Sequence, residues 1–486
     1  MRKIFISLSL VLMSFMSRAQ TVESWITTAG GEMLLEKGQS TEFQAKPEGR
    51  QSPIVVDSRQ AYQSMEGFGF ALTGGSAELL MKMTPDARKN ILNELFSRDA
   101  LGISYIRLTV GASDMNGTVF SYDDIPEGKT DFTLKHFSLA NDLNDVVPVM
   151  KEILEINPDI RIMASPWSAP AWMKEEYDVR GPKLRRDCYD VYSRYFVRYI
   201  QEMAKQGIRI DALTIQNEPL NNRNTPSMPW DPQDQTEFIR DYLGPQFASN
   251  GVKTKIILFD HNCDRPDYPL AILSDPEAAG YASGVAFHHY MGDVSAMSQV
   301  HSARPDKDIY FTEQMIVDRS GSVSRNIAQN VKRMLIDVPR NWSRNVILWN
   351  LAADPEAGPH TGNGGCPFCH GAITIDGDKV SRNIAYYTIA HASAFVPSGS
   401  LRIASTAPED PAVMLSEDEQ HPGVIRVNHY DRSNVLPNVA YSTPDGRLVL
   451  IVSNTTSAAV TFNVQHNGRY APFTLESGAV GTYIWK

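Results

Sequence analysis

Eight short apolar segments, separated by helix-like stretches, constrain the fold of this chain more than any other feature. Each segment is rich in β-branched or aromatic residues and is bounded by turn residues, as buried parallel strands are. The intervening helix over Tyr189–Gln206 is the clearest, because apolar residues recur in it with helical spacing and Gly207 follows as a stop. Strands that alternate with helices in this way predict a (β/α)8 TIM barrel. The eight expected strands are Gly67–Thr73, Tyr105–Val110, Ile160–Ala164, Ala212–Gln216, Lys255–Asp260, Val285–Tyr290, Ile309–Glu313 and Val346–Asn350.

The barrel accounts for only part of the 486 residues. We expect it to span residues 59–396, because the helical patterns end there and only strands and polar turns follow. Residues 397–486 therefore predict an antiparallel β-sandwich. Residues 20–58 also form only short strands, and we expect them to complete the same sandwich. The predicted fold class is α/β, a TIM barrel with an appended antiparallel β-sandwich.

The first 19 residues have the pattern of a secretory signal peptide. Arg2 and Lys3 precede an apolar stretch, and Ser17-Arg18-Ala19 supplies the small residues of a cleavage site. The apolar stretch is short for a membrane anchor, and no other segment is apolar enough to cross a bilayer. We expect a secreted or periplasmic protein with no membrane span in the mature chain.

The charge of the chain excludes some classes of partner. The net charge is −10 and the chain has no long run of Lys or Arg. Nucleic acids and anionic membranes bind concentrated basic faces, so neither is expected as a partner.

Two glutamates carry the strongest functional signal. Glu218 follows the fourth expected strand in Gln216-Asn217-Glu218-Pro219, and Glu313 ends the seventh in Thr312-Glu313-Gln314. A TIM barrel places its chemistry at the C-terminal ends of its strands. Two carboxylates that face each other there are the groups that hydrolyse a glycosidic bond. In this interpretation Glu218 is an acid/base with a raised pKa, and Glu313 is the ionised nucleophile. A single strand-end glutamate more often forms only an ion pair.

The residues around these glutamates favour a catalytic pair over simple ion pairs. Over nearly its whole mature length the chain resembles glycoside hydrolase family 30, a family of retaining TIM-barrel glycosidases. The matching segments occur in family order and are Gly67–Thr73, Ile106–Leu108, Ala164–Lys174, the Gln-Asn-Glu-Pro run, His288–Tyr290, the Thr-Glu-Gln run and Leu348–Leu351. The resemblance implies that Glu218 is the acid/base and Glu313 the nucleophile.

The same resemblance implies roles for further residues. Arg107 would keep the nucleophile ionised and oriented, although an ordinary barrel ion pair is the alternative. Asn217 is similar to the asparagine that donates to the sugar 2-hydroxyl, and Asp114 to a carboxylate that binds outer hydroxyls. Tyr290 matches a tyrosine beside the nucleophile. The remaining candidates are Trp167 and Trp349, whose flat faces suit a pyranose ring unless they are core residues.

Histidine and cysteine patterns leave more alternatives open. His288 and His289 have no carboxylate or cysteine at ligand spacing, so we expect hydrogen-bonded structural residues and no metal or cofactor. Cys366-Pro367-Phe368-Cys369-His370 fits covalent haem attachment, half of a zinc site, or a local disulfide that export favours. The Gly-Gly-Cys-x-x-Cys segment resembles a loop in the β-1,6-glucanase branch of the family, and a Cys366–Cys369 disulfide is the interpretation that we adopt.

The predicted function is hydrolysis of β-glucosidic linkages, with β-1,6-glucan as substrate. The alternatives are a glucosylceramidase-like or other β-glycosidase and a non-catalytic glycan-binding protein. Thr361–Gly365 is small and Gly-rich where glucosylceramidases have an aromatic, which suits a polymer better than a lipid-linked sugar. We expect the two carboxyl groups to lie about 5–5.5 Å apart, as in retaining enzymes, rather than about 6.5–9.5 Å. Endo or exo action, the number of subsites and the oligomeric state are not predicted.

Overall fold

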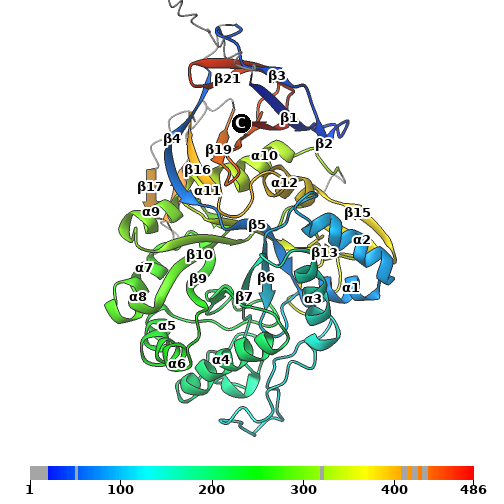
Figure 1. Ribbon diagram of the computed structural model, residues 1–486. Helices are drawn as coiled ribbons and strands as arrows, with labels where there is room; N and C mark the ends of the chain where they lie inside the picture. The colour runs from blue at the N-terminus through cyan, green and yellow to red at the C-terminus, as the bar shows by residue number, and fades with distance from the viewer. Residues whose placement is uncertain (1–19, 50–52, 318–321, 407–413, 418–424, 429–435) are drawn as a thin grey trace, which may run out of the picture.

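The computed structural model describes residues 20–49, 53–317, 322–406, 414–417, 425–428 and 436–486. The expected signal peptide lies outside the described residues, so its cleavage stays a prediction. Figure 1 shows a barrel with its surrounding helices and, above it, a group of strands from both ends of the chain.

Eight parallel strands form the barrel, as the sequence predicts. They pair in chain order from β5 to β11, and β12 returns to pair with β5. A parallel bridge between Ile309 and Ser343 joins the region of β11 to that of β12 and closes the ring. The strands are β5 (Gly67–Leu72), β6 (Tyr105–Thr109), β7 (Arg161–Ser165), β8 (Ala212–Thr214), β9 (Lys255–Cys263), β10 (Ala282–Gly292), β11 (Asp308–Glu313) and β12 (Asn345–Asn350).

The fourth strand is shorter than the sequence predicts. β8 ends at Thr214, and the chain then leaves the sheet. The Asn217 N–H donates to the carbonyl of Pro166 at 2.7 Å, and the Glu218 N–H donates to that of Asp260 at 3.0 Å. Glu218 therefore lies in the loop beyond β8, fixed between the ends of the two neighbouring strands.

Helices cover the outside of the barrel between successive strands (Figure 1). In α4 (Tyr189–Lys205) the residues that the sequence placed on the apolar face, among them Val191 and Tyr195, are buried, and Gly207 follows with φ +82°. The other helices are α1 (Gly74–Lys82), α2 (Pro85–Phe96), α3 (Val146–Ile156), α5 (Pro232–Glu237), α6 (Gly244–Ser249), α7 (Asp267–Leu273), α8 (Pro276–Tyr281), α9 (Ser295–Ala303), α10 (Ile327–Val331), α11 (Val338–Arg340) and α12 (Ile384–Ser393).

The N-terminal strands pair with C-terminal strands. β1 pairs antiparallel with β23, and the long strand β4 pairs with both β16 and β21. The order is β2-β1-β23-β20-β19-β16-β4-β21-β22, with β3 on β1. These strands are β1 (Thr21–Thr27), β2 (Leu34–Lys37), β3 (Thr41–Glu42), β4 (Ile54–Ser64), β16 (Leu401–Ser405), β19 (Asn438–Ser442), β20 (Leu448–Ser453), β21 (Val460–His466), β22 (Arg469–Leu475) and β23 (Val480–Trp485).

Two small sheets complete the described structure. One follows β12 and consists of β13 (Ala352–Ala353), β14 (Ile373–Asp376) and β15 (Lys379–Arg382). The other is the pair β17 (Met414–Glu417) and β18 (Ile425–Asn428).

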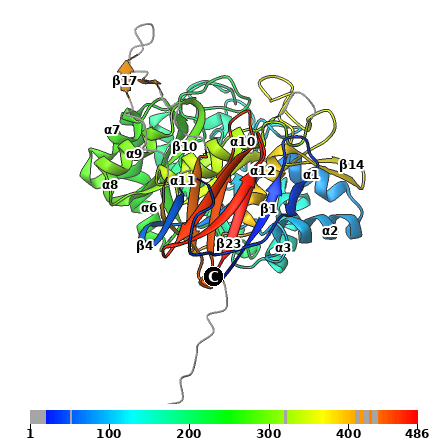
Figure 2. The same cartoon turned by 90° about the horizontal axis from the view of Figure 1, so that it is seen from above.

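The barrel packs against the strands that the two ends of the chain form. α12 lies beside β1 and β23 (Figure 2), and His391 on α12 is buried. Its two ring nitrogens lie 2.9 Å from Thr482 Oγ1 and 2.8 Å from Thr27 Oγ1. The junction thus holds the barrel against the strands that cover it.

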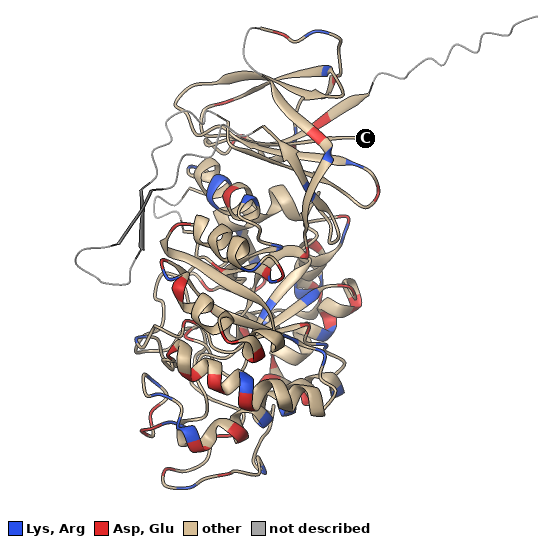
Figure 3. Ribbon diagram, turned by 90° about the vertical axis from the view of Figure 1, so that its left-hand side faces the viewer, with Lys and Arg blue, Asp and Glu red and all other residues tan. Residues whose placement is uncertain are grey.

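None of the helices in the described residues is long and apolar enough to cross a membrane. Figure 3 shows acidic and basic residues interspersed over the barrel helices. This distribution agrees with the net charge of −10 and the lack of long basic runs in the sequence.

Candidate active site

Glu218 and Glu313 face each other at the C-terminal end of the barrel strands. Glu313 is the last residue of β11, and Glu218 follows β8. Both are buried. One oxygen of each carboxylate and a ring nitrogen of His288 all lie within 4.8 Å of one another. The topology therefore brings together two carboxylates that are 95 positions apart in the printed sequence.

Two donors fix the carboxylate of Glu313. Arg107 Nη1 donates to Oε2 at 2.6 Å, and the Tyr290 hydroxyl donates to Oε1 at 3.0 Å. The Met315 N–H in turn donates to the Tyr290 oxygen at 3.1 Å. Both oxygens of Glu313 are thus oriented by groups from β6 and β10, which are separate strands.

A different pair of donors fixes Glu218. His288 Nδ1 lies 3.1 Å from Oε1, and the Asn221 side-chain amide donates to Oε2 at 2.6 Å. Glu218 has φ +47°, a conformation that non-glycine residues adopt rarely and that is characteristic of functional sites. Asn221 is a partner that the sequence analysis did not identify, because no pattern marks it.

Asp260 is the centre of the network, and the sequence analysis placed it at a strand end without assigning it a role. It is fully buried and accepts hydrogen bonds from Arg107 at 2.7 Å, from Ser165 at 3.0 Å and from Thr312 at 2.6 Å. His288 Nε2 lies 3.0 Å from its Oδ1. Asp260 therefore connects the arginine that holds Glu313 to the histidine that holds Glu218. The signal in the sequence was its place at the end of the fifth strand, on the rim where the glutamates lie.

The pKa values correct one expectation. Burial raises the pKa of Glu218, but the hydrogen bond and charge of His288 outweigh it and lower the pKa to about 2. Burial also raises the pKa of Glu313, and the positive charges of His288 and Arg107 do not fully compensate. The expected raised pKa on Glu218 is wrong for this arrangement.

His288 holds the proton that was expected on Glu218. Burial lowers the pKa of His288, but the charge of Glu313 and the hydrogen bonds to Asp260 and Glu218 raise it to about 9. Because both ring nitrogens face carboxylates, His288 is an imidazolium that donates from each nitrogen.

The two tryptophans are core-like rather than open. Trp167 is 1% exposed and Trp349 is 4% exposed. Their ring centres are 5.3 Å apart, and the Arg107 guanidinium lies 4.8 Å from the Trp167 ring and 5.9 Å from the Trp349 ring. Neither presents the open flat face that was expected. Instead, their contacts hold Arg107 in a cation–π arrangement.

Asn217 and Asp114 lie on the same rim. Asn217 accepts a 2.7 Å hydrogen bond from Arg107 through its side-chain oxygen. Asp114 is buried, and burial together with the charges of Glu313 and Glu218 raises its pKa to about 8. A side-chain hydrogen bond with Trp167 acts in the opposite direction and lowers this pKa. A carboxyl on this rim can exchange hydrogen bonds with a substrate hydroxyl.

The Cys366–Cys369 disulfide is confirmed, with the two Cα atoms 5.4 Å apart. Because the two sulfurs are bonded to each other, haem attachment through this motif is excluded in this form of the chain. Cys369 packs with Trp167 and Trp349, and Cys366 and Met315 pack against the same cluster. The disulfide loop is thus part of the wall of the site.

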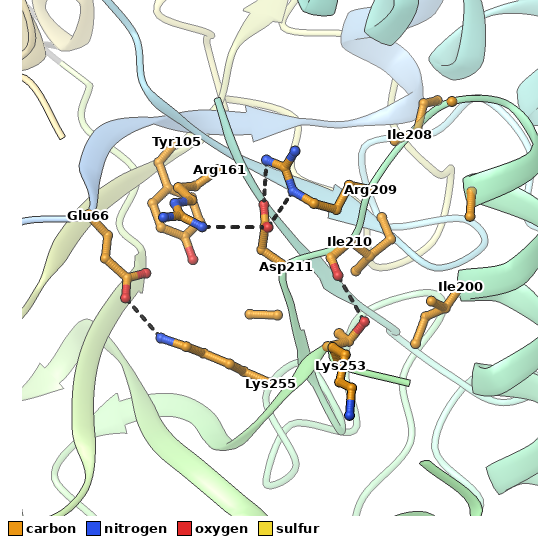
Figure 4. Close-up of a pocket in the computed structure, with 14 residues that line it drawn as sticks. Glu66, Tyr105, Arg161, Ile200, Ile208, Arg209, Ile210, Asp211, Lys253 and Lys255 are labelled. Carbon is orange, nitrogen blue, oxygen red and sulfur yellow. Dashed lines mark hydrogen bonds and ion pairs between the residues drawn. The ribbon is translucent and has the colours of Figure 1, made fainter. Parts of the chain in front are cut away.

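A pocket of about 510 Å³ lies at the opposite end of the barrel (Figure 4). Tyr105, Ala212 and Lys255, which begin β6, β8 and β9, line it. Two ion pairs lie in its lining, with Lys255 3.0 Å from Glu66 and Arg209 2.5 Å from Asp211. In TIM barrels this end contributes to stability rather than to catalysis, so we do not assign the chemistry to it.

Comparison with known proteins agrees with the site. Residues 65–396 match the glycosyl hydrolase family 30 TIM-barrel domain, and residues 423–483 match the glycosyl hydrolase family 30 beta sandwich domain. The chain belongs to glycoside hydrolase family 30. The resemblance, the fold class and the prediction of a glycoside hydrolase are therefore confirmed.

Individual proteins are similar to this chain over most of their length. Endo-1,6-beta-D-glucanase neg1 of Aspergillus fumigatus is 29% identical over 86% of this chain and 82% of its own. Lysosomal acid glucosylceramidase of Mus musculus is 28% identical over 95% of this chain and 88% of its own. The solved structure of the endo-beta1,6-glucanase BT3312 is 31% identical, with a TM-score of 0.83 over 96% of this chain and 99% of its own.

Proposed function

We propose that this family 30 hydrolase cleaves β-1,6-glucan with retention of anomeric configuration. The observation that carries the proposal is the pair of buried carboxylates, each held by its own donors on opposite sides of the barrel mouth. One oxygen of Glu218 lies within 4.8 Å of one oxygen of Glu313. This distance supports the separation of about 5–5.5 Å between the carboxyl groups that retaining glycosidases have. The similarity to endo-1,6-glucanases supports the substrate and internal cleavage.

Glu313 is the nucleophile in this proposal. With Arg107 on Oε2 and Tyr290 on Oε1, its carboxylate is oriented toward the anomeric carbon. A bond forms from Glu313 to that carbon as the bond to the glycosidic oxygen breaks, and Asn217 is placed to bind the 2-hydroxyl. The product of this step is a glycosyl ester on Glu313.

The leaving oxygen takes its proton from Glu218, which is resupplied by His288. The charge of Glu313 is the largest influence that keeps His288 protonated against its burial. As the ester forms, that charge is neutralised, and in the same step Glu218 protonates the glycosidic oxygen while the His288 proton moves along the 3.1 Å contact to Glu218. In the second step a water attacks the ester, and its proton returns through Glu218 to His288.

The proposal includes export. Arg2, Lys3 and the apolar stretch that follows them support a signal peptide, with cleavage after Ala19 and delivery to the periplasm or the exterior. Edman sequencing of protein recovered from the secreting host should begin at Gln20. A chain that begins at Met1 would contradict the cleavage.

Substrate preference is tested by assay on soluble pustulan, laminarin, xylan and glucosylceramide. We expect turnover of pustulan to exceed that of the other three. Cleavage of glucosylceramide or xylan without pustulan activity would contradict the substrate. The pustulan product profile also distinguishes the modes of attack, since internal cleavage releases a ladder of oligosaccharides and terminal cleavage releases a single small sugar.

Retention is tested by NMR of the first products. We expect the β-anomer to be released first and the α-anomer to accumulate only through mutarotation. An initial α signal would mean that the two glutamates act by single displacement with a water between them.

The pH profile should report the proton on His288. Because its pKa rises to about 9 in the folded chain, kcat/KM should fall as the pH rises through about 9. The free energy of unfolding should fall over a similar range, because the pKa of His288 is higher in the folded chain than in the unfolded chain. The contribution of His288 is fully present below pH about 6.5 and is lost between about 6.5 and 9.

His288→Gln should abolish both the alkaline limb near pH 9 and the pH-dependent part of the stability. His261→Gln is the matched control, because burial lowers the pKa of His261 to about 4 and it does not titrate in this window. An unchanged alkaline limb in His288→Gln would contradict the proton relay.

A further inference from the structure

The pocket at the N-terminal end of the barrel strands has the size of a small-molecule site. Its volume of about 510 Å³ lies within the range of about 300–1,000 Å³ that such sites have. Figure 4 shows the Tyr105 hydroxyl directed into the space between Glu66 and Asp211. The length of the barrel strands separates this pocket from the two glutamates of the active site, so a ligand bound in it does not occupy the place of the reacting sugar.

The Tyr105 hydroxyl is a buried donor without a hydrogen-bond partner. Tyr105 is 0% exposed, and its oxygen has no partner among the described residues. Burial and the charges of Glu66 and Asp211 raise the pKa of Tyr105 well above its usual value, so the hydroxyl keeps its proton. A buried hydroxyl without a partner destabilises a fold, and a phenylalanine would fill the same space without that loss. The hydroxyl therefore indicates an acceptor that enters the pocket.

Positive charge exceeds negative charge in the lining of this pocket. Four cationic side chains and two acidic ones contribute, namely Arg161, Arg209, Lys253, Lys255, Glu66 and Asp211. Each acidic side chain lies within 3.0 Å of one of the cations, so neither is an unpaired negative charge. Lys253 is exposed and has no ion pair or side-chain hydrogen bond within the part of the chain that the structure describes. In a chain whose net charge is −10, this local excess of positive charge favours an anionic ligand.

The rest of the lining is mostly apolar. Ile200 lies on α4, and Ile208 and Ile210 lie in the segment between α4 and β8. Figure 4 shows these three isoleucines on the side of the pocket away from Glu66. A ligand that carries an oxyanion at one end and a short apolar group at the other would therefore contact both parts of the pocket.

We infer that this pocket binds a small organic oxyanion, a carboxylate or a phosphate monoester with a short apolar group. The oxyanion accepts the hydrogen bond of the Tyr105 hydroxyl and is attracted by the excess of positive charge, and the apolar group packs against the isoleucines. The site is a binding site without chemistry of its own. The inference goes beyond the proposed hydrolysis of glucan and does not depend on it, because the two sites lie at opposite ends of the barrel.

The inference is tested by calorimetric titration of the intact protein with butyrate, butyl phosphate and 1-butanol. We expect at least one of the two anions to bind and the neutral alcohol, which has the same apolar group, not to bind. The anion with the lower Kd identifies the ligand as a carboxylate or a phosphate monoester. That anion should also raise the temperature of unfolding, because it binds only the folded chain. Binding of neither anion, or equal binding of the alcohol, would overturn the inference.

Two variants place the bound anion in this pocket. Tyr105→Phe removes only the hydroxyl, and we expect the Kd of the preferred anion to rise about tenfold. Lys253→Gln should raise the Kd by a smaller factor, because its ammonium group is exposed to solvent. Neither variant should change kcat on glucan. Both residues lie at the opposite end of the barrel from the glutamates.

Tyr192→Phe is the matched control for Tyr105→Phe. The Tyr192 hydroxyl is also fully buried and without a partner among the described residues, but Tyr192 does not line the pocket. Its loss should leave the Kd unchanged. An unchanged Kd in both Tyr105→Phe and Lys253→Gln would show that the anion binds elsewhere on the protein and would overturn the inference. An equal rise in Kd in Tyr105→Phe and Tyr192→Phe would also overturn it.

Discussion

Glu313→Ala should lower kcat on β-1,6-glucan by about 10⁴-fold or more, because no other group can form the glycosyl ester. Arg107 and Tyr290 would remain in place around the vacated position, since each is also held by other partners. Added azide should restore turnover of an aryl β-glucoside and give the α-glycosyl azide, because the anion attacks from the side that Glu313 occupied. The anomeric configuration of the azide product, measured by NMR, checks the assignment.

Glu218→Ala distinguishes the acid/base from the nucleophile. It should retain formation of the glycosyl ester from a substrate with a good leaving group, and azide should then give the β-glycosyl azide by displacing Glu313. The control is Glu66→Gln, a change in a glutamate bound to Lys255 at the other end of the barrel, which should leave kcat unchanged. If the two alanine variants gave azides of the opposite configurations, the assignments of acid/base and nucleophile would be reversed. Turnover of glucan by both variants at the wild-type rate would remove the catalytic roles assigned to the two glutamates, and binding without turnover by the wild type would indicate a glycan-binding protein.

Asp260→Asn should be the most destabilising single substitution that keeps the shape of the side chain. Asp260 is fully buried and neutralises Arg107, whose guanidinium is also fully buried. Removing one charge of a buried pair costs about 3–5 kcal/mol of unfolding free energy, because the other charge stays buried without full compensation. Urea or thermal unfolding measures the loss. We also expect kcat to fall by about 100-fold or more, since Arg107 and His288 both lose their anchor.

Asp142→Asn is the matched control for Asp260→Asn. Asp142 is also buried, but its hydrogen-bond partner is the Tyr122 hydroxyl, and burial raises its pKa to about 7. Because Asp142 is not paired with a buried cation, an amide there should cost far less. Similar losses of stability in the two variants would show that burial, rather than the charge pair with Arg107, sets the cost at Asp260.

The sequence predicted the eight strands, the two glutamates and the disulfide, because each leaves a local signal. Strands of a parallel barrel are short apolar runs, and a carboxylate at the end of such a run is visible without coordinates. The boundary of β8 was predicted less well, since the chain after Thr214 replaces regular sheet pairing with single hydrogen bonds to the carbonyl groups of Pro166 and Asp260. The resemblance to family 30 supplied Arg107, Asn217, Asp114 and Tyr290, whose contacts lie between strands far apart in the chain.

The amino-acid pattern by itself determined the architecture and the reacting groups, since hydrophobic periodicity fixes which residues are buried and which strand ends share a rim. Only the tertiary structure decided where the proton lies. Protonation depends on charges a few ångströms away, and those of Asp260 and Glu313 on His288 come from other strands. The same reason explains why Trp167 and Trp349 cover Arg107. Burial and pairing at this site are properties of the closed barrel rather than of any one segment.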